Sequence, residues 1–575
     1  MNYKEEYQHW LDSPALSNAE WEELKSIADD EREIESRFFA PLEFGTAGLR
    51  GIMGMGLNRM NVHVIRHATQ GFAGVICAEG ELARKKGVAI CYDCRNNSER
   101  FAREAASVMA GNGISVRIFE AMRPTPELSF AVIHYGCTAG LNITASHNPK
   151  EYNGYKVYWS DGAQLPPQHA EAVAKAMAET DLFNGIKYMD FDEAVGKGLI
   201  TFMGEDCDEA FLKCVLAQAI DPDEVAEVAD DFKIVYTPFH GTGYKLVPEA
   251  LSRLGIKHIV PVPEQMVIDG NFPTVVSPNP ENPEGFELAV KLAKEVNSDL
   301  IIGTDPDSDR VGVMVRDRSG EYVCISGNQM GVLLLDYIIE ARKAKGTLPE
   351  NAAAVKTIVT TEMAREVCER QGVHIDDTFT GFKFMAEKLA EYKRDGSYQY
   401  LMAYEESYGY MMGDYVRDKD AVTAVMMIAE MAAHYFKRGM SLADAMESLY
   451  EKYGWFAEKT LNLVMPGLDG LEKMKNLMAE LRENPPREIE GSAVLRLKDY
   501  KAGTITVPEL GVMGSTPISG SNVLYFDMED GCSFIVRPSG TEPKIKIYIL
   551  ARGADKAACQ AKVEKYAAYA ETLRR

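Results

Sequence analysis

The stretch DLIIGTDPDSDR, residues 299–310, joins a short apolar run to a loop rich in carboxylates. The run predicts a buried strand, and α/β folds place ligand sites at the carboxyl ends of such strands. Asp305, Asp307 and Asp309 would repel one another unless a divalent cation offset their charge, and oxygen ligands suit Mg²⁺ or Ca²⁺. An EF-hand is excluded because its glycine and glutamate positions hold Arg310 and Arg316. A solvated acidic turn is the alternative.

Around this stretch the chain alternates short apolar runs with amphipathic segments, which predicts strand–helix–strand units and mostly parallel sheets. Three units share this plan, and they run over residues 87–122, 232–305 and 353–384. The last portion instead has short predicted strands followed by the helix DKAACQAKVEKYAAYAETLRR (555–575), which indicates an α+β domain. We therefore expect an α/β protein: three similar α/β domains with mixed, mostly parallel sheets, plus a C-terminal α+β domain. Residues 1–40 are predicted to form a helical extension in which Trp10 and Trp21 dock.

Composition and charge exclude several classes of protein. The net charge of the 575 residues is −24, which argues against a nucleic-acid partner. The first residues lack a signal-peptide pattern, and no apolar run reaches the length of a membrane span. Ten scattered cysteines favour a reducing, cytoplasmic location, and the lone Cys91-x-x-Cys94 pair has no second pair at zinc spacing. We expect a cytoplasmic protein that is a monomer or a small homo-oligomer.

Three further stretches carry groups that suit a phosphorylated sugar. RPSGTEPKIKIY (537–548) brings Arg537 to a turn with Ser539, Gly540 and Thr541, where an oxyanion would find a guanidinium, hydroxyls and backbone N–H groups. An exposed arginine on an ordinary turn is the alternative. TGFKF (380–384) and YEESYGY (404–410) place carboxylates among aromatic residues, which suits sugar hydroxyls, although acids at a helix start would look the same.

The loop TASHNPKEYNGYK (144–156) sets Ser146 beside His147, with Lys156 further on. The serine is a candidate nucleophile, but it does not lie in a G-x-S-x-G elbow. EFGTAGLRG (43–51) and VRDKDAV (416–422) present Arg50 and Lys419, each of which could instead be an ordinary surface residue. A Walker A loop and a strand followed by G-x-G-x-x-G are absent from the sequence.

Four segments, in this order along the chain, closely resemble the motifs of the α-D-phosphohexomutase superfamily: TASHNP, DPDSDR, EESYG and RPSGTEP. The resemblance spans about residues 40–575 and is nearest to the phosphoglucomutase branch, which includes phosphopentomutase-like enzymes. It implies four domains around a central cleft. The expected division is a helical extension and four domains, at residues 1–40, 41–208, 209–322, 323–450 and 451–575.

The resemblance also implies a role for each loop. Ser146 would carry the phosphoryl group and complete a Mg²⁺ site on Asp305, Asp307 and Asp309. Residues of three segments would hold the substrate: Thr380, Gly381, Lys383, Glu405 and Ser407 the sugar, and Arg537, Ser539, Gly540 and Thr541 the phosphate. The remaining catalytic positions would be Arg50, His147, Lys156, Arg310 and Lys419, with Lys419 or His147 as the base.

The implied reaction is the interconversion of α-D-glucose 1-phosphate and glucose 6-phosphate, through a phosphoserine and glucose 1,6-bisphosphate. Phosphopentomutase is an alternative, because the sugar loop has Tyr408 where many glucose-directed members have Phe. Phosphomannomutase is another, but the Met-Ser-Gly-His type of loop of bifunctional mannose/glucose members is absent, which favours glucose. Less favoured are a glucose-1,6-bisphosphate synthase, a Mg²⁺-dependent phosphatase that uses Ser146, and a non-catalytic sugar-phosphate binder.

Overall fold

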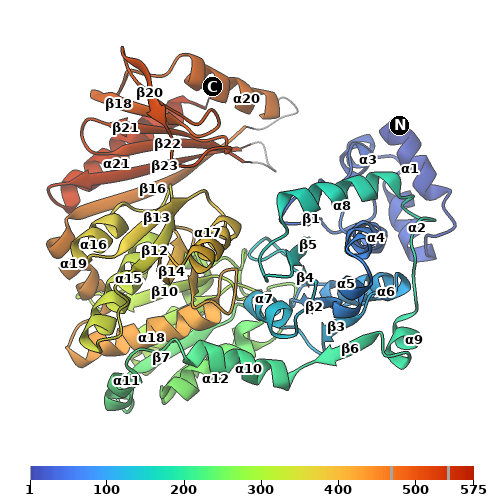
Figure 1. The fold of residues 1–575 in the computed structure, drawn as a ribbon, viewed down its shortest axis with the longest axis horizontal. Coiled ribbons are helices and arrows are strands. Elements are labelled where there is room, and N and C mark those ends of the chain that lie inside the picture. Colours follow the sequence, from blue (N-terminus) through green and yellow to red (C-terminus); the bar gives the residue numbers. More distant parts are fainter. Residues whose placement is uncertain (1, 466–469, 540–543, 575) are drawn as a thin grey trace. The chain divides into compact units, whose positions relative to one another are not determined.

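The computed structural model describes residues 2–465, 470–539 and 544–574 (Figure 1). The chain divides into two units. Unit 1 contains the described residues of the ranges 1–325 and 408–441. Unit 2 contains those of 326–407 and 442–575.

Three short helices open unit 1: α1 (Tyr3–Leu11), α2 (Asn18–Ser26) and α3 (Glu31–Phe38). Capping boxes start the first two, because the side chains of Asn2 and Ser17 accept from backbone N–H groups that the helices leave unpaired. Trp10 is fully buried and meets Phe38 and Phe183 edge to face at 5.7 and 5.2 Å. The segment therefore belongs to the hydrophobic core of unit 1, as expected for Trp10, whereas Trp21 stays partly exposed.

The first sheet has the strand order β1-β5-β4-β2-β3-β6. Strands β4, β2, β3 and β6 run parallel, and β5 and β1 add antiparallel at one edge. The strand bounds are β1 (Leu49–Ile52), β2 (Val88–Tyr92), β3 (Val116–Phe119), β4 (Ala139–Ile143), β5 (Tyr152–Trp159) and β6 (Ile200–Met203). The helices of this region are α4 (Val62–Ala78), α5 (Glu81–Lys86), α6 (Ser98–Gly111), α7 (Thr125–His134), α8 (Pro167–Glu179) and α9 (Phe191–Gly196).

The second sheet of unit 1 has the order β11-β10-β9-β7-β8, in which β9, β7 and β8 are parallel. Its strands are β7 (Lys233–Thr237), β8 (His258–Pro261), β9 (Leu300–Thr304), β10 (Val311–Arg316) and β11 (Tyr322–Ile325). The associated helices are α10 (Glu205–Leu216), α11 (Pro222–Val228), α12 (Gly243–Leu254), α13 (Pro263–Met266) and α14 (Glu287–Val296). Helix α18 (Ala421–Lys437), which follows β15 (Gly409–Met412), packs against α10, α11 and α12.

Unit 2 begins with three parallel strands, in the order β13-β12-β14. Their bounds are β12 (Ala352–Thr357), β13 (His374–Thr378) and β14 (Gln399–Glu405), and the helices are α15 (Gly327–Ala344), α16 (Met363–Gln371), α17 (Phe382–Asp395) and α19 (Leu442–Tyr453). A second, antiparallel sheet has the order β16-β23-β22-β21-β18-β19-β20, and β17 pairs with β18.

The strands of this last sheet are β16 (Trp455–Val464), β17 (Glu488–Ile489), β18 (Ser492–Asp499), β19 (Thr504–Val507), β20 (Gly511–Ser515), β21 (Leu524–Met528), β22 (Ser533–Pro538) and β23 (Lys544–Gly553). Helices α20 (Gly470–Glu483) and α21 (Lys556–Thr572) complete the region, and α21 packs on β16 and β23. The predicted fold class, α/β with mixed sheets and a final α+β region, is confirmed. Among the described residues, no helix has both the length and the apolar character that crossing a bilayer requires.

Candidate active site

Ser146 lies in the loop that follows β4, and its backbone adopts a left-handed φ of 52°. A non-glycine residue holds this conformation only where its surroundings fix it. Its backbone N–H donates to Thr144 Oγ1 at 2.9 Å. The side-chain hydroxyl, which is almost fully buried, donates to Asp305 Oδ2 at 2.9 Å and lies 3.1 Å from His147 Nδ1. The structure thus brings the predicted nucleophile to the predicted metal loop.

Arg95 holds the serine loop in shape, and the sequence analysis missed it. Its guanidinium donates to four backbone carbonyls of the loop: Ser146 and Asn148 at 2.5 Å, Pro149 at 2.9 Å and Tyr152 at 3.1 Å. The Arg95 side chain is fully buried, and Asp93 neutralises it with an Oδ2 atom 3.3 Å from Nε. Only the folded chain shows this role, because an arginine after a predicted strand has no local signature for it.

The three aspartates form one buried cluster after β9. One carboxylate oxygen of each lies within 4.8 Å of those of the other two. Asp305 Oδ1 accepts from the backbone N–H groups of Asp309 and Arg310 at 3.0 and 2.9 Å, so its other oxygen is left to face Ser146. Burial and the neighbouring carboxylates raise the pKa of Asp305 well above its usual value.

Two lysines offset the charge of this cluster. Lys156 Nζ lies 2.7 Å from Asp307 Oδ2 and 3.3 Å from Asp309 Oδ2, and Lys419 Nζ lies 3.2 Å from the same Asp309 oxygen. Burial opposes ionisation of Asp307, but Lys156 outweighs it and holds the pKa of this carboxyl low. Asp418, also missed from sequence, accepts from Lys419 Nζ at 3.0 Å.

Three other predicted residues lie around the serine loop. Burial, with Arg310 and Arg50 nearby, lowers the pKa of His147 well below its usual value, so its ring is neutral near pH 7. Arg310 Nη1 pairs with Glu281 at 2.9 Å. Arg50 Nη1 donates to Asn148 Oδ1 at 3.0 Å from the exposed face of β1. All six predicted catalytic residues therefore occur in unit 1 with the acidic cluster.

The predicted sugar-binding residues lie in unit 2, at the ends of β13 and β14. Glu405 is the last residue of β14 rather than the start of a helix, and it is buried. Its Oε1 accepts from the Gly381 N–H at 2.5 Å, and its Oε2 accepts from Ser407 Oγ at 3.3 Å. Gly381 has a φ of +121°, which favours glycine there. Thr380 and Lys383 flank it and are partly exposed.

The predicted phosphate-binding turn follows β22 in the same unit. Arg537 Nη1 donates to the Tyr548 hydroxyl at 3.3 Å, and the Ser539 N–H donates to the Lys544 carbonyl at 2.8 Å. Burial raises the pKa of Tyr548, the carboxylate of Glu406 adds to this, and Arg537 opposes it. Phe379, which precedes Thr380, packs in one hydrophobic cluster with Ile535 of β22 and Tyr548 of β23, so the two loops approach each other within unit 2. Gly540 and Thr541 lie outside the described residues.

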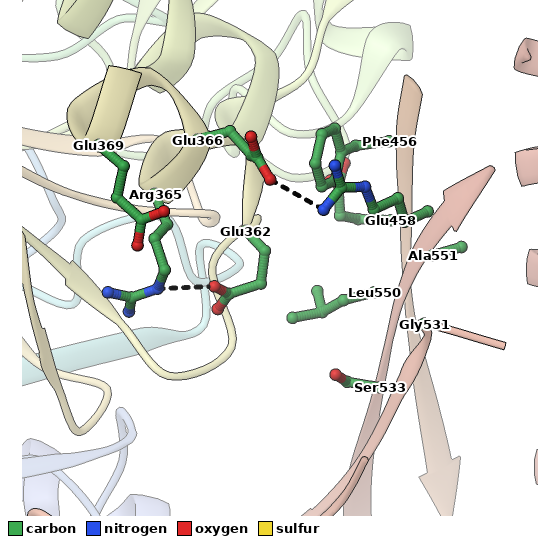
Figure 2. A pocket seen from close by; sticks show the side chains of 11 residues that line it. Glu362, Arg365, Glu366, Glu369, Phe456, Glu458, Gly531, Ser533, Leu550 and Ala551 are labelled. Carbon is green, nitrogen blue, oxygen red and sulfur yellow. Dashed lines mark hydrogen bonds and ion pairs between the residues drawn. The ribbon is translucent and has the colours of Figure 1, made fainter. Parts of the chain in front are cut away.

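A pocket of about 220 Å³ lies between α16 and the strands β16 and β23 of unit 2, and it holds none of the predicted site residues (Figure 2). Arg365 pairs with Glu362 at 3.0 Å, and Arg552 pairs with Glu366 at 2.8 Å. Glu458 also lines this pocket, and burial raises its pKa to about 7.

Three features together define a class of protein, the α/β proteins equipped for phosphoryl transfer. These features are a serine hydroxyl on an acidic cluster, basic side chains around it, and a strand-end loop that can hold a cation. Models of the phosphoglucomutase/phosphomannomutase family match at four places: alpha/beta/alpha domains I, II and III at 41–183, 209–320 and 326–453, and the C-terminal domain at 480–565. The chain belongs to the phosphoglucomutase/phosphomannomutase family, within the α-D-phosphohexomutase superfamily, and is an enzyme of the isomerase class.

Curated relatives agree with this assignment, and solved structures share the fold. A phosphoglucomutase of Staphylococcus saprophyticus is 36% identical over 90% of this chain and 92% of its own, and one of Staphylococcus aureus strain N315 is 35% identical over 92% and 93%. A putative phosphomannomutase from Thermus thermophilus has the same fold, with a TM-score of 0.67 at 21% identity over 92% of this chain and 99% of that one. The parafusin phosphoglucomutase of Paramecium, in its open form, scores 0.66 at 16% identity over 92% and 94%.

Proposed function

We propose that the enzyme interconverts α-D-glucose 1-phosphate and glucose 6-phosphate, with Ser146 as the residue that carries the phosphoryl group. The observation behind this proposal is the 2.9 Å contact between Ser146 Oγ and Asp305, inside a buried acidic cluster with two lysines. The curated relatives named phosphoglucomutase support glucose as the sugar.

The proposed reaction has two transfers. Phosphorylated Ser146 gives its phosphoryl group to the free hydroxyl of the sugar monophosphate, which yields glucose 1,6-bisphosphate and a free serine. The bisphosphate then reverses its orientation, and the Ser146 hydroxyl takes the other phosphoryl group. The sugar leaves with its phosphate on the other carbon, and the serine is phosphorylated again.

We propose Asp305, Asp307, Asp309 and an oxygen on Ser146 as ligands for Mg²⁺. The fit is supported by Asp307 Oδ1 and Asp309 Oδ1, two buried oxygens that accept no hydrogen bond from any residue the structure describes. Oxygen-only donors of this kind suit a hard cation. A bound Mg²⁺ would supply Lewis-acid stabilisation of the negative charge on the transferring group.

The proton of the attacking sugar hydroxyl needs an acceptor, and we propose Lys419, with His147 as the alternative. Lys419 would accept it as a neutral amine, after releasing the proton that pairs it with Asp309 and Asp418. In the second transfer the proton leaves Ser146 itself. The neutral ring of His147, 3.1 Å from Ser146 Oγ, supports its role as acceptor there. Lys156, Arg310 and Arg50 would offset the charge of the phosphoryl group.

Sugar and non-transferred phosphate would be held by unit 2. We propose that Thr380, Gly381, Lys383, Glu405 and Ser407 contact the sugar, and that Arg537, Ser539, Gly540 and Thr541 contact the phosphate. We also keep the division into 1–40, 41–208, 209–322, 323–450 and 451–575 as our proposed domains. The ten free cysteines suit the reducing environment of the cytoplasm.

Initial rates on α-glucose 1-phosphate, mannose 1-phosphate and ribose 1-phosphate test the proposal, with Mg²⁺ and catalytic glucose 1,6-bisphosphate present. We expect the fastest conversion for the glucose substrate, no net release of inorganic phosphate, and no activity in the Ser146→Ala variant. Faster turnover of ribose or mannose phosphate would make the enzyme a phosphopentomutase or a phosphomannomutase. Stoichiometric phosphate release would make it a phosphatase.

A further inference from the structure

Thr125, the first residue of α7, connects the first sheet to the acidic cluster. Its backbone N–H donates to the Asp307 carbonyl at 2.8 Å, and its hydroxyl donates to Asp307 Oδ2 at 2.7 Å. Asn142, in the middle of β4, donates its side-chain N–H to the same Thr125 hydroxyl at 2.7 Å. All three side chains are completely buried, so water does not compete for these bonds.

The chemistry of these groups gives the chain of bonds one direction. The Asn142 amide nitrogen is only a donor, so the Thr125 oxygen accepts from it. The hydroxyl proton of Thr125 is then directed to Asp307 Oδ2, which also receives Lys156 Nζ at 2.7 Å. Asp307 Oδ2 is therefore fully engaged, while Oδ1 accepts no hydrogen bond from the described part of the chain.

The segment that carries Thr125 is firmly anchored. Pro124 and Pro126 restrict the backbone on both sides. Arg123 donates to both carboxylate oxygens of Asp208, at 2.6 and 3.1 Å. The Thr125 hydroxyl does not cap its own helix, since α7 begins without a side-chain cap.

We infer that Thr125 is a positioning residue, which turns the Asp307 carboxylate so that Oδ1 faces the cation site. This inference rests on the proposed use of the aspartate cluster as a Mg²⁺ site. Asn142 enforces the direction of the Thr125 hydroxyl from the strand that leads to Ser146. These bonds thereby fix the position of the cation-binding loop relative to β4, the strand that leads to the loop of Ser146.

Calorimetric titration with Mg²⁺, without any sugar, tests this on the full-length protein. Thr125→Val keeps the shape and removes the hydroxyl, and it should weaken Mg²⁺ binding about 10- to 100-fold, the usual effect of losing a partner that orients a ligand. Thr125→Ser keeps the hydroxyl and should bind close to wild type. Thr138→Val is the matched control, because this buried hydroxyl donates to the Ala83 carbonyl at 2.8 Å and not to the metal loop.

Mg²⁺ affinity in Thr125→Val equal to that in Thr138→Val would overturn the inference, even if both variants lost stability. If Thr125→Val does not fold, Asn142→Ala serves instead, because it frees the hydroxyl to turn away from Asp307. Asn142→Ala should also weaken Mg²⁺ binding. Wild-type Mg²⁺ affinity in this variant would refute the inference. A wild-type enzyme that binds Mg²⁺ but does not convert glucose 1-phosphate would defeat the proposed function and leave this inference intact.

Discussion

Replacing Glu458 with Gln should stabilise unit 2 at neutral and alkaline pH. Glu458 lies on β16 in the pocket of Figure 2, where Arg365 and Arg552 are already paired with Glu362 and Glu366. Burial is the main influence on its carboxyl, and the pKa rises to about 7 in the folded protein. The neutral amide of glutamine avoids the cost of burying a charge in the same space.

The sign and size of the effect follow from proton linkage. Between the ordinary pKa of the unfolded chain, near 4.5, and about 7, the folded state binds more protons than the unfolded state. Stability contributed by this residue therefore falls as pH rises through that window, and the full loss is present above about pH 7. One pKa unit corresponds to about 1.4 kcal/mol, so the loss of stability is at most about 3 kcal/mol for this partly buried side chain.

Hydrogen exchange measured across a urea series would give the free energy of unfolding for peptides of β16 and β23. The free energy of unfolding of Glu458→Gln should exceed that of wild type by up to about 3 kcal/mol near pH 8 and by less than about 1 kcal/mol near pH 5. Glu488 is an exposed residue of β17, and Glu488→Gln should change the free energy of unfolding by no more than about 0.5 kcal/mol. A gain in Glu458→Gln that is the same at both pH values would refute the reasoning, since it could not come from the charge.

Two further predictions concern unit 1. Trp10→Ala should destabilise this unit by about 3–5 kcal/mol in urea unfolding, because removing a fully buried indole leaves a cavity. Trp21 is partly exposed, so Trp21→Ala should cost less than about 1 kcal/mol. Equal effects of the two variants would mean that the first helices do not belong to the core. Lys419→Met should lower kcat about 10²- to 10⁴-fold if this lysine accepts the sugar proton, with the surface variant Lys437→Met as control. An unchanged kcat would transfer that role to His147.

Local sequence was sufficient to predict structure and site residues wherever the interacting groups lie within a few residues of one another. DLIIGTDPDSDR joins a buried strand to its carboxylates in one continuous segment, so β9 and the acidic cluster were both predictable. The strand–helix–strand units were predictable for the same reason, because apolar periodicity is a property of short windows.

Contacts between distant segments were not predictable. Thr125 and Asp307 are 182 residues apart, and Arg95 reaches carbonyls more than 50 residues away. Neither residue type has a pattern that reveals such a partner. The position of Glu405 and Glu406 was also ambiguous from sequence, because acidic residues at the end of a strand and at the start of a helix look the same in a short segment.

Helix α18 has a consequence for how the protein is made. Residues 421–433 of this helix are all buried, and it packs in unit 1 against α11 and α12. Yet residues 326–407, which belong to unit 2, are synthesised before it. The ribosome therefore releases the apolar faces of α11 and α12 well before the helix that covers them emerges. Nascent chains of this enzyme must carry that exposed surface through the synthesis of more than a hundred residues, a period in which chaperone binding competes with aggregation.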